Sequence, residues 1–158
     1  MSTEKIVDFN TLDNSMQELV KECIAVREMA YAPYSKFKVG AALRCEDGSI
    51  TTGCNVENAA YPLAICAERV AIGKAISEGK RKFTAIAVAA DIIHGSKNAS
   101  PCGMCRQMMT EFGDMPVLLT SPDRMKIQST SVVELLPFSF GFENIKNGIQ
   151  FPINHNIE

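Results

Sequence analysis

The sequence has no long apolar run and no leader-like beginning. No window of about 18 consecutive apolar residues is present, which argues against a membrane-spanning helix. The first 20 residues, MSTEKIVDFNTLDNSMQELV, lack the basic start and the apolar stretch of a secretory signal. We therefore expect a cytoplasmic protein with no membrane partner.

An excess of one charge is also absent. Lysine and arginine number 16 against 18 aspartates and glutamates, which gives a formal net charge of −2. Such a chain lacks the basic surface that holds a polyanion, so we expect no nucleic-acid partner. No internal repeat and no linker rich in glycine, serine or proline divides the chain. We predict one domain over residues 1–158, with a core at about 15–142 and a C-terminal tail at 143–158.

Apolar periodicity and turn residues predict alternating helices and strands. Helices are expected at 15–30, 66–79 and 102–112, with a short one at 131–137. Strands are expected at 39–45, 50–56, 84–90, 117–120 and 125–129. The run at 84–90 is apolar throughout, as in a central strand covered on both faces. Together these elements predict an α/β protein with three layers, α/β/α, around a mixed five-stranded sheet.

Capping residues mark the ends of several predicted helices. Ser15 with Glu18, and Ser131 with Glu134, have the spacing of a capping box at a helix start. Gly79 stands where a left-handed residue would end the second helix. These positions give the helix boundaries above.

The cysteine pattern predicts a metal site. Six cysteines are present, but a chain with 46% hydrophobic residues and no secretory signal does not need disulfides. Cys102 and Cys105 form a C-x-x-C pair at a predicted helix start, where residues three apart face the same way, and Cys66 begins another helix. Helix starts favour thiolates because they carry a partial positive charge. Three thiolates would leave one tetrahedral position of a zinc ion open, as in catalytic zinc sites.

One acidic residue and two arginines accompany these cysteines. Glu68 lies two residues after Cys66, in the first turn of the same predicted helix, where it can reach the open metal position without ligating the ion. A dication with three thiolates is net negative and requires positive groups nearby. We predict that Arg69 and Arg106, which follow the ligands, hydrogen-bond the sulfurs.

Two other interpretations of the cysteines stay open at this point. A lone C-x-x-C pair is also typical of a redox dithiol, although Cys66 and the preceding Pro101 favour the metal site. Cys54 could supply a fourth ligand and close a structural zinc site. Cys23 and Cys45 resemble core residues.

The residues around these cysteines resemble a known family. A C-x-E element followed by P-C-x-x-C, here at 66–68 and 101–105, is a signature of zinc deaminases. Residues 15–142 are similar to the small homotetrameric cytidine deaminases with three cysteine ligands. The similar segments are APYS at 32–35, VGAAL at 39–43, GCNVENA at 53–59, ICAER at 65–69, SPCG at 100–103, CRQ at 105–107 and ELLP at 134–137.

The resemblance implies a reaction and its cofactor. The reaction is zinc-dependent hydrolytic deamination of free cytidine and deoxycytidine to uridine and deoxyuridine plus ammonia, in pyrimidine salvage. The implied partner is a small-molecule nucleoside, and Glu68 is implied to move the protons.

The resemblance also implies further roles at the site. Phe37 would pack against the pyrimidine ring, and Asn55 and Glu57 would bond the ribose hydroxyls. Ala67 would contact the substrate. In a homotetramer, two aromatic residues would reach the active site of a neighbouring subunit, namely Tyr61 and Phe140.

Three rival functions differ in what they require. A related deaminase could act on an aminoacyl-nucleoside antibiotic, but Asn55 and Glu57 favour a plain ribose. Editing of polynucleotides needs a positively charged groove that the composition does not supply. A zinc-stabilised interaction module would bind metal without turning over nucleosides.

Overall fold

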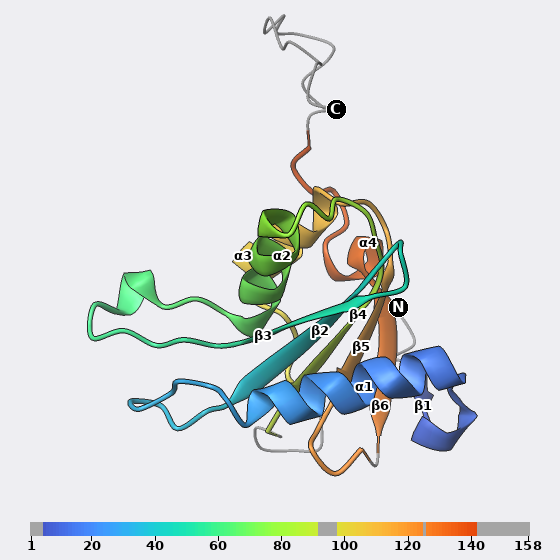
Figure 1. Ribbon diagram of the computed structural model, residues 1–158, viewed down its shortest axis with the longest axis horizontal. Coiled ribbons are helices and arrows are strands. Elements are labelled where there is room, and N and C mark those ends of the chain that lie inside the picture. Colours follow the sequence, from blue (N-terminus) through green and yellow to red (C-terminus); the bar gives the residue numbers. More distant parts are fainter. Residues whose placement is uncertain (1–4, 92–97, 125, 142–158) are drawn as a thin grey trace, which may run out of the picture.

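The computed structural model describes residues 5–91, 98–124 and 126–141 (Figure 1). Its helices are α1 (Asn14–Arg27), α2 (Ala67–Ser77), α3 (Gly103–Thr110) and α4 (Val132–Leu135), with 3-10 turns at Phe9–Thr11 and Tyr61–Leu63. Its strands are β1 (Lys5–Val7), β2 (Val39–Cys45), β3 (Ile50–Cys54), β4 (Phe83–Ala90), β5 (Pro116–Thr120) and β6 (Ile127–Ser131). Within these residues, no helix has the length and apolar character needed to cross a membrane.

The strands form one mixed sheet with the order β1-β6-β5-β4-β2-β3. β4 and β5 run parallel, with Ile86 opposite Val117, and all other neighbouring strands are antiparallel. The predicted mixed α/β sheet with β4 near its centre is confirmed. The predicted number of five strands is wrong, because the three-residue strand β1 adds a sixth at the edge beside β6. A segment this short carries too little alternation to be recognised as a strand.

The two faces of β4 separate two hydrophobic clusters. Ala85, Ala87 and Ala89 point toward α1, whose Leu19 and Cys23 are fully buried. Because side chains alternate along a strand, the intervening residues point to the opposite face, which α2, α3 and α4 cover. Helices therefore lie on both faces of the sheet, and the predicted three-layer arrangement is confirmed (Figure 1).

The helix caps agree in part with the sequence prediction. The capping box of Ser131 and Glu134 is present at the start of α4. The predicted box of Ser15 and Glu18 is wrong, because the N-cap of α1 lies two residues earlier than expected. Its N-cap is Asp13, whose carboxylate accepts a hydrogen bond from the backbone N–H of Met16 at 2.9 Å. An aspartate with extended backbone geometry is a favourable N-cap, so Ser15 becomes an ordinary first-turn residue.

Close contact between β3 and α2 depends on Gly53. A Cβ atom at this position would lie 2.4 Å from the backbone nitrogen of Ala71 and 2.7 Å from the carbonyl oxygen of Ala67, both in α2. No side chain fits at these distances without moving the helix. Gly53 therefore sets how closely the first turns of α2 approach the sheet.

We expect Gly53→Ala to lower the free energy of unfolding by about 1–3 kcal/mol, because overpacking forces the backbone apart. Gly73→Ala is the matched control in α2, since its added Cβ meets no other described atom within 4 Å. Replacing that helical glycine should leave stability unchanged or raise it by up to about 1 kcal/mol. Urea denaturation followed by circular dichroism measures both, and a Gly53→Ala protein as stable as the wild type would contradict this account.

Candidate active site

Three cysteine sulfurs meet at the N-terminal ends of α2 and α3. The Sγ atoms of Cys66 and Cys102 lie 3.8 Å apart, those of Cys102 and Cys105 lie 3.6 Å apart, and all three are within 4.8 Å of one another. Zinc–thiolate bonds of about 2.3 Å in tetrahedral geometry require sulfurs roughly 3.8 Å apart. The three side chains therefore fit a zinc ion without rearrangement of the backbone.

Helix geometry explains why these sulfurs converge. Cys66 is the N-cap of α2 and Cys102 is the N-cap of α3, and neither side chain caps its helix by a hydrogen bond to a described residue. Both sulfurs thus remain available to a metal. Cys105 lies three residues after Cys102, on the same face of the first turn.

The thiols differ in acidity although they lie side by side. A hydrogen bond from Cys105, opposed by burial and assisted by Arg69, lowers the pKa of Cys66 to about 5. The same bond and burial raise the pKa of Cys105. One thiolate is therefore present at neutral pH before a metal binds, and metal binding must displace the proton of Cys105.

Arg69 compensates this negative charge as the sequence predicts. Its Nη2 donates to the sulfur of Cys66 at 3.8 Å and to the carbonyl oxygen of Ala64 at 3.2 Å. Burial lowers the pKa of the Arg69 guanidinium, but the hydrogen bonds and negative charges of Cys66 and Cys105 together outweigh burial, so the pKa is raised. The guanidinium stays charged and joins a metal ligand to the loop before α2.

Glu68 is the buried carboxyl group of the cluster. It occupies the first turn of α2, directly beyond Ala67, and is 3% exposed. Burial raises the pKa of the Glu68 carboxyl, and the negative charge of Cys66 acts in the same direction. A carboxyl group with a raised pKa can both accept and donate a proton near neutral pH.

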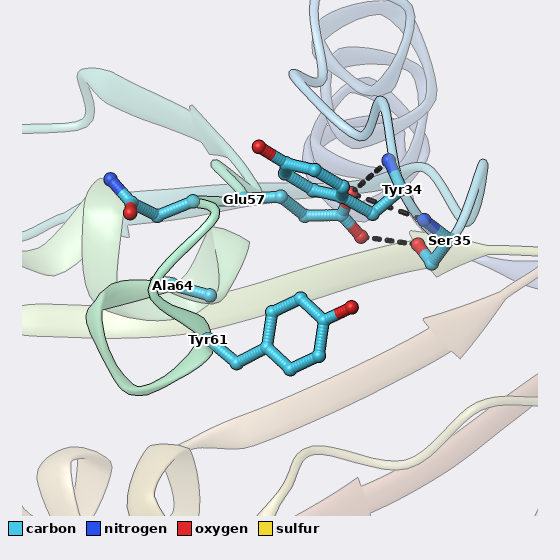
Figure 2. A pocket seen from close by; sticks show the side chains of 6 residues that line it. Tyr34, Ser35, Glu57, Tyr61 and Ala64 are labelled. Atoms are coloured by element: carbon cyan, nitrogen blue, oxygen red, sulfur yellow. Dashed lines mark hydrogen bonds between the residues drawn. The ribbon is translucent and has the colours of Figure 1, made fainter.

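The chain has a pocket of about 380 Å³, and Figure 2 shows the side chains that line it. It lies between two long loops that project on the same side of the sheet in Figure 1, residues 28–38 and 55–66. Its lining residues are Tyr34, Ser35, Glu57, Asn58, Tyr61 and Ala64. Ala64 connects it to the sulfurs, because Arg69 bonds both Ala64 and Cys66.

Comparisons with known proteins agree with this geometry. Residues 13–121 match the family described as the cytidine and deoxycytidylate deaminase zinc-binding region. The chain belongs to this family. A cytidine deaminase of Sporosarcina psychrophila is 50% identical over 132 residues, which cover 82% of this chain and 94% of the relative. A cytidine deaminase of Halalkalibacterium halodurans is 49% identical over 133 residues, covering 83% and 98%.

A solved structure is similar as well. The crystal structure of cytidine deaminase from Burkholderia pseudomallei has 46% sequence identity and a TM-score of 0.74, with 82% of this chain and 100% of that chain covered. The family's zinc-binding region and the three-sulfur cluster together identify zinc as the cofactor of this deaminase-family chain.

The remaining cysteines do not join the metal cluster. Among the described residues, the sulfurs that lie close enough to share an ion are those of Cys66, Cys102 and Cys105, so Cys54 does not close the site. Cys23 and Cys45 are buried free thiols, as expected for core residues. A zinc ion held by these three sulfurs alone, among the described residues, would have one tetrahedral position open, as a catalytic zinc needs.

Arg106 does not contact sulfur, and this part of the sequence prediction is wrong. Its guanidinium donates to the carbonyl oxygens of Pro101 at 2.8 Å and Leu135 at 2.7 Å, and to the Ser100 hydroxyl at 2.8 Å. These bonds tie the start of α3 to the end of α4. Arg106 thus holds the loop before Cys102 in place, which sequence spacing alone did not reveal.

Of the other residues named by resemblance, some line the pocket and others make contacts elsewhere. Glu57 and Tyr61 line it. The amide of Asn55 accepts from the Val39 N–H at 2.8 Å and donates to the Phe37 carbonyl at 2.9 Å, so it fixes the chain on both sides of Lys38.

Phe140 lies near α3 and is 67% exposed. Its carbonyl oxygen accepts a bond from the Gln107 side chain at 2.7 Å. The sequence analysis gave no role to the lining residues Tyr34, Ser35, Asn58 and Ala64, although Tyr34 and Ser35 fall in the quoted APYS segment.

We expect Cys102→Ser to lose most of the bound zinc, because a hydroxyl is a far weaker zinc ligand than a thiolate. Cys54→Ser should keep about one zinc per chain. Zinc is counted by mass spectrometry on protein purified without chelators. Loss of the metal from Cys54→Ser would show that Cys54 is a fourth ligand.

Proposed function

We propose that this chain removes the 4-amino group of free cytidine and deoxycytidine by hydrolysis, giving uridine and deoxyuridine plus ammonia. The observation that carries the proposal is the set of three sulfurs at tetrahedral spacing beside the buried carboxyl group of Glu68. The two relatives and the solved structure described above support the same substrate class. We place the reaction in pyrimidine salvage in the cytoplasm.

Glu68 performs the proton transfers in this proposal. When bound, zinc supplies the Lewis-acid chemistry that makes water a nucleophile near neutral pH. Glu68 accepts a proton from the attacking water and delivers it to ring nitrogen 3. It then accepts the proton of the new hydroxyl group on carbon 4 and delivers it to the amine, which leaves as ammonia. Its burial suits this work, because burial raises the pKa of the carboxyl group and so favours the protonated form that donates to the substrate.

Substrate contacts are assigned around the same centre. We assign Phe37 to the face of the pyrimidine ring and Ala67 to the substrate beside the metal. Asn55 and Glu57 are assigned to the ribose hydroxyls. Hydrogen bonds from Ser35 and from backbone N–H groups lower the pKa of Glu57, so this carboxylate is ionised and can accept from a sugar hydroxyl.

Glu68→Gln should reduce kcat by about a hundredfold to ten-thousandfold, because the amide cannot transfer protons while keeping nearly the same shape. Zinc content and thermal stability should match the wild type. The fall in ultraviolet absorbance as cytidine becomes uridine measures the rate. Near-wild-type turnover by Glu68→Gln would remove this residue from the mechanism.

A parallel assay on cytidine, deoxycytidine, cytosine and an aminoacyl-nucleoside antibiotic, with zinc counted per chain, tests the substrate class. Turnover of both nucleosides supports the proposal. Protein that holds one zinc per chain and turns over none of them would instead be a zinc-stabilised binding module.

We also propose that four copies assemble into a homotetramer, in which Tyr61 and Phe140 reach a neighbouring active site. In a single chain Tyr61 is 74% exposed and Phe140 is 67% exposed, as expected of aromatic residues that a neighbouring subunit covers in an assembly. Light scattering should give four times the 17.3 kDa mass of one chain. A monomeric mass together with full activity would contradict the assembly.

A further inference from the structure

One hydroxyl group connects the two loops that enclose the pocket. The Ser35 side chain donates a short hydrogen bond to Oε1 of Glu57, and it accepts one from the backbone N–H of Phe37 at 3.0 Å. It therefore stands between the carboxylate assigned to the ribose and the aromatic residue assigned to the base. Figure 2 shows Ser35 and Glu57 facing one another on the pocket wall.

The hydrogen bonds that described residues donate to Glu57 use three of the lone pairs of its carboxylate. Oε2 accepts from the backbone N–H groups of Tyr34 at 2.9 Å and Ser35 at 3.2 Å. A carboxylate offers about four lone-pair positions, two on each oxygen. Hydrogen bonds from the described residues take two positions on Oε2 and one on Oε1, so among them the remaining position lies on the oxygen that the Ser35 hydroxyl holds.

We propose that Ser35 is a positioning residue for the sugar, which fixes the Glu57 carboxylate so that the remaining lone pair of Oε1 receives a ribose hydroxyl. This inference rests on the proposed function, and it adds a determinant of specificity that the sulfur cluster and Glu68 do not provide. Glu57 is 23 residues from Tyr34 and 22 from Ser35 along the chain, so the arrangement exists only when the two loops are in place.

The proposed arrangement selects for a hydroxyl donor. An ionised carboxylate only accepts hydrogen bonds, and Ser35 is the first cause of the lowered pKa of Glu57. A ligand without hydroxyls in this region would displace the water that hydrogen-bonds Oε1 and would offer no hydrogen bond in its place. Sites built to bond a hydroxyl reject analogues that lack it more strongly than apolar pockets reject a missing methylene group.

A comparison of two substrates on two enzymes isolates this effect. Ser35→Ala removes the hydroxyl but keeps both backbone bonds to Oε2, so the loop retains most of its attachment. For cytidine, kcat/KM should fall about tenfold, mainly through a higher KM, as expected for one lost bond that orients a charged group. For 2′,3′-dideoxycytidine, which lacks the 2′ and 3′ hydroxyls, kcat/KM should change less than about threefold.

Two further variants show whether the effect is specific. Ser35→Thr keeps the hydroxyl and should restore the preference for cytidine to within about threefold of the wild type. Ser49→Ala is the matched control, because the Ser49 hydroxyl also donates to a carboxylate, Asp47, at 2.6 Å, but in the turn between β2 and β3. Ser49→Ala should leave kcat/KM for both nucleosides unchanged.

The outcomes separate this inference from the proposed function. If the wild type does not deaminate cytidine, both are overturned. If the wild type is active and Ser35→Ala lowers kcat/KM equally for the two nucleosides, Ser35 acts only on loop structure and the positioning role is overturned alone. A Ser35→Ala enzyme with unchanged kcat/KM for both nucleosides also overturns the positioning role. A fall in kcat/KM for cytidine alone supports it.

Discussion

The meeting of two helix N-termini is the constraint on which the rest of the site depends. Cys66 and Cys102 take the N-cap positions of α2 and α3, so three sulfurs lie where the helices present unpaired N–H groups and partial positive charge. The sheet must hold both helix starts to within a fraction of an ångström for one ion to fit. Gly53 under α2 and Arg106 within α3 serve that purpose, although neither side of this packing involves a hydrogen bond to a ligand sulfur among the described residues.

The chemistry near the sulfurs and the recognition of substrate come from different parts of the fold. The cluster and Glu68 belong to helix starts packed against the sheet, where a hydrogen bond from Cys105 lowers the pKa of Cys66 and burial raises the pKa of Glu68. The pocket belongs to two loops that cross-link each other through side-chain-to-backbone bonds. Arg69 joins these parts, because one nitrogen of its guanidinium bonds both a ligand sulfur and the loop. Variation in the loops can therefore alter specificity without disturbing the metal.

Local patterns in the sequence predicted most of the fold and the metal cluster. The C-x-x-C spacing and the Ser131 capping box act within one helical turn, so the structure reproduces them. One error is local, since Asp13 and not Ser15 is the N-cap of α1. The other errors arise where distant contacts decide. β1 exists through pairing with β6, more than a hundred residues away, and Arg106 is directed by the carbonyl of Leu135. The role of Ser35 likewise depends on Glu57, and no spacing rule connects two loops.

The order of the ligands along the chain has a consequence for how the protein matures. Cys66 precedes the central strand β4, whereas Cys102 follows it, 36 residues later. No contiguous fragment shorter than the segment from α2 to α3 can supply all three thiolates. A growing polypeptide can complete its zinc site only after β4 has been synthesised and α3 has docked beside α2. A bound ion would join two segments of the chain that β4 separates, and it would tie the start of α2 to the start of α3.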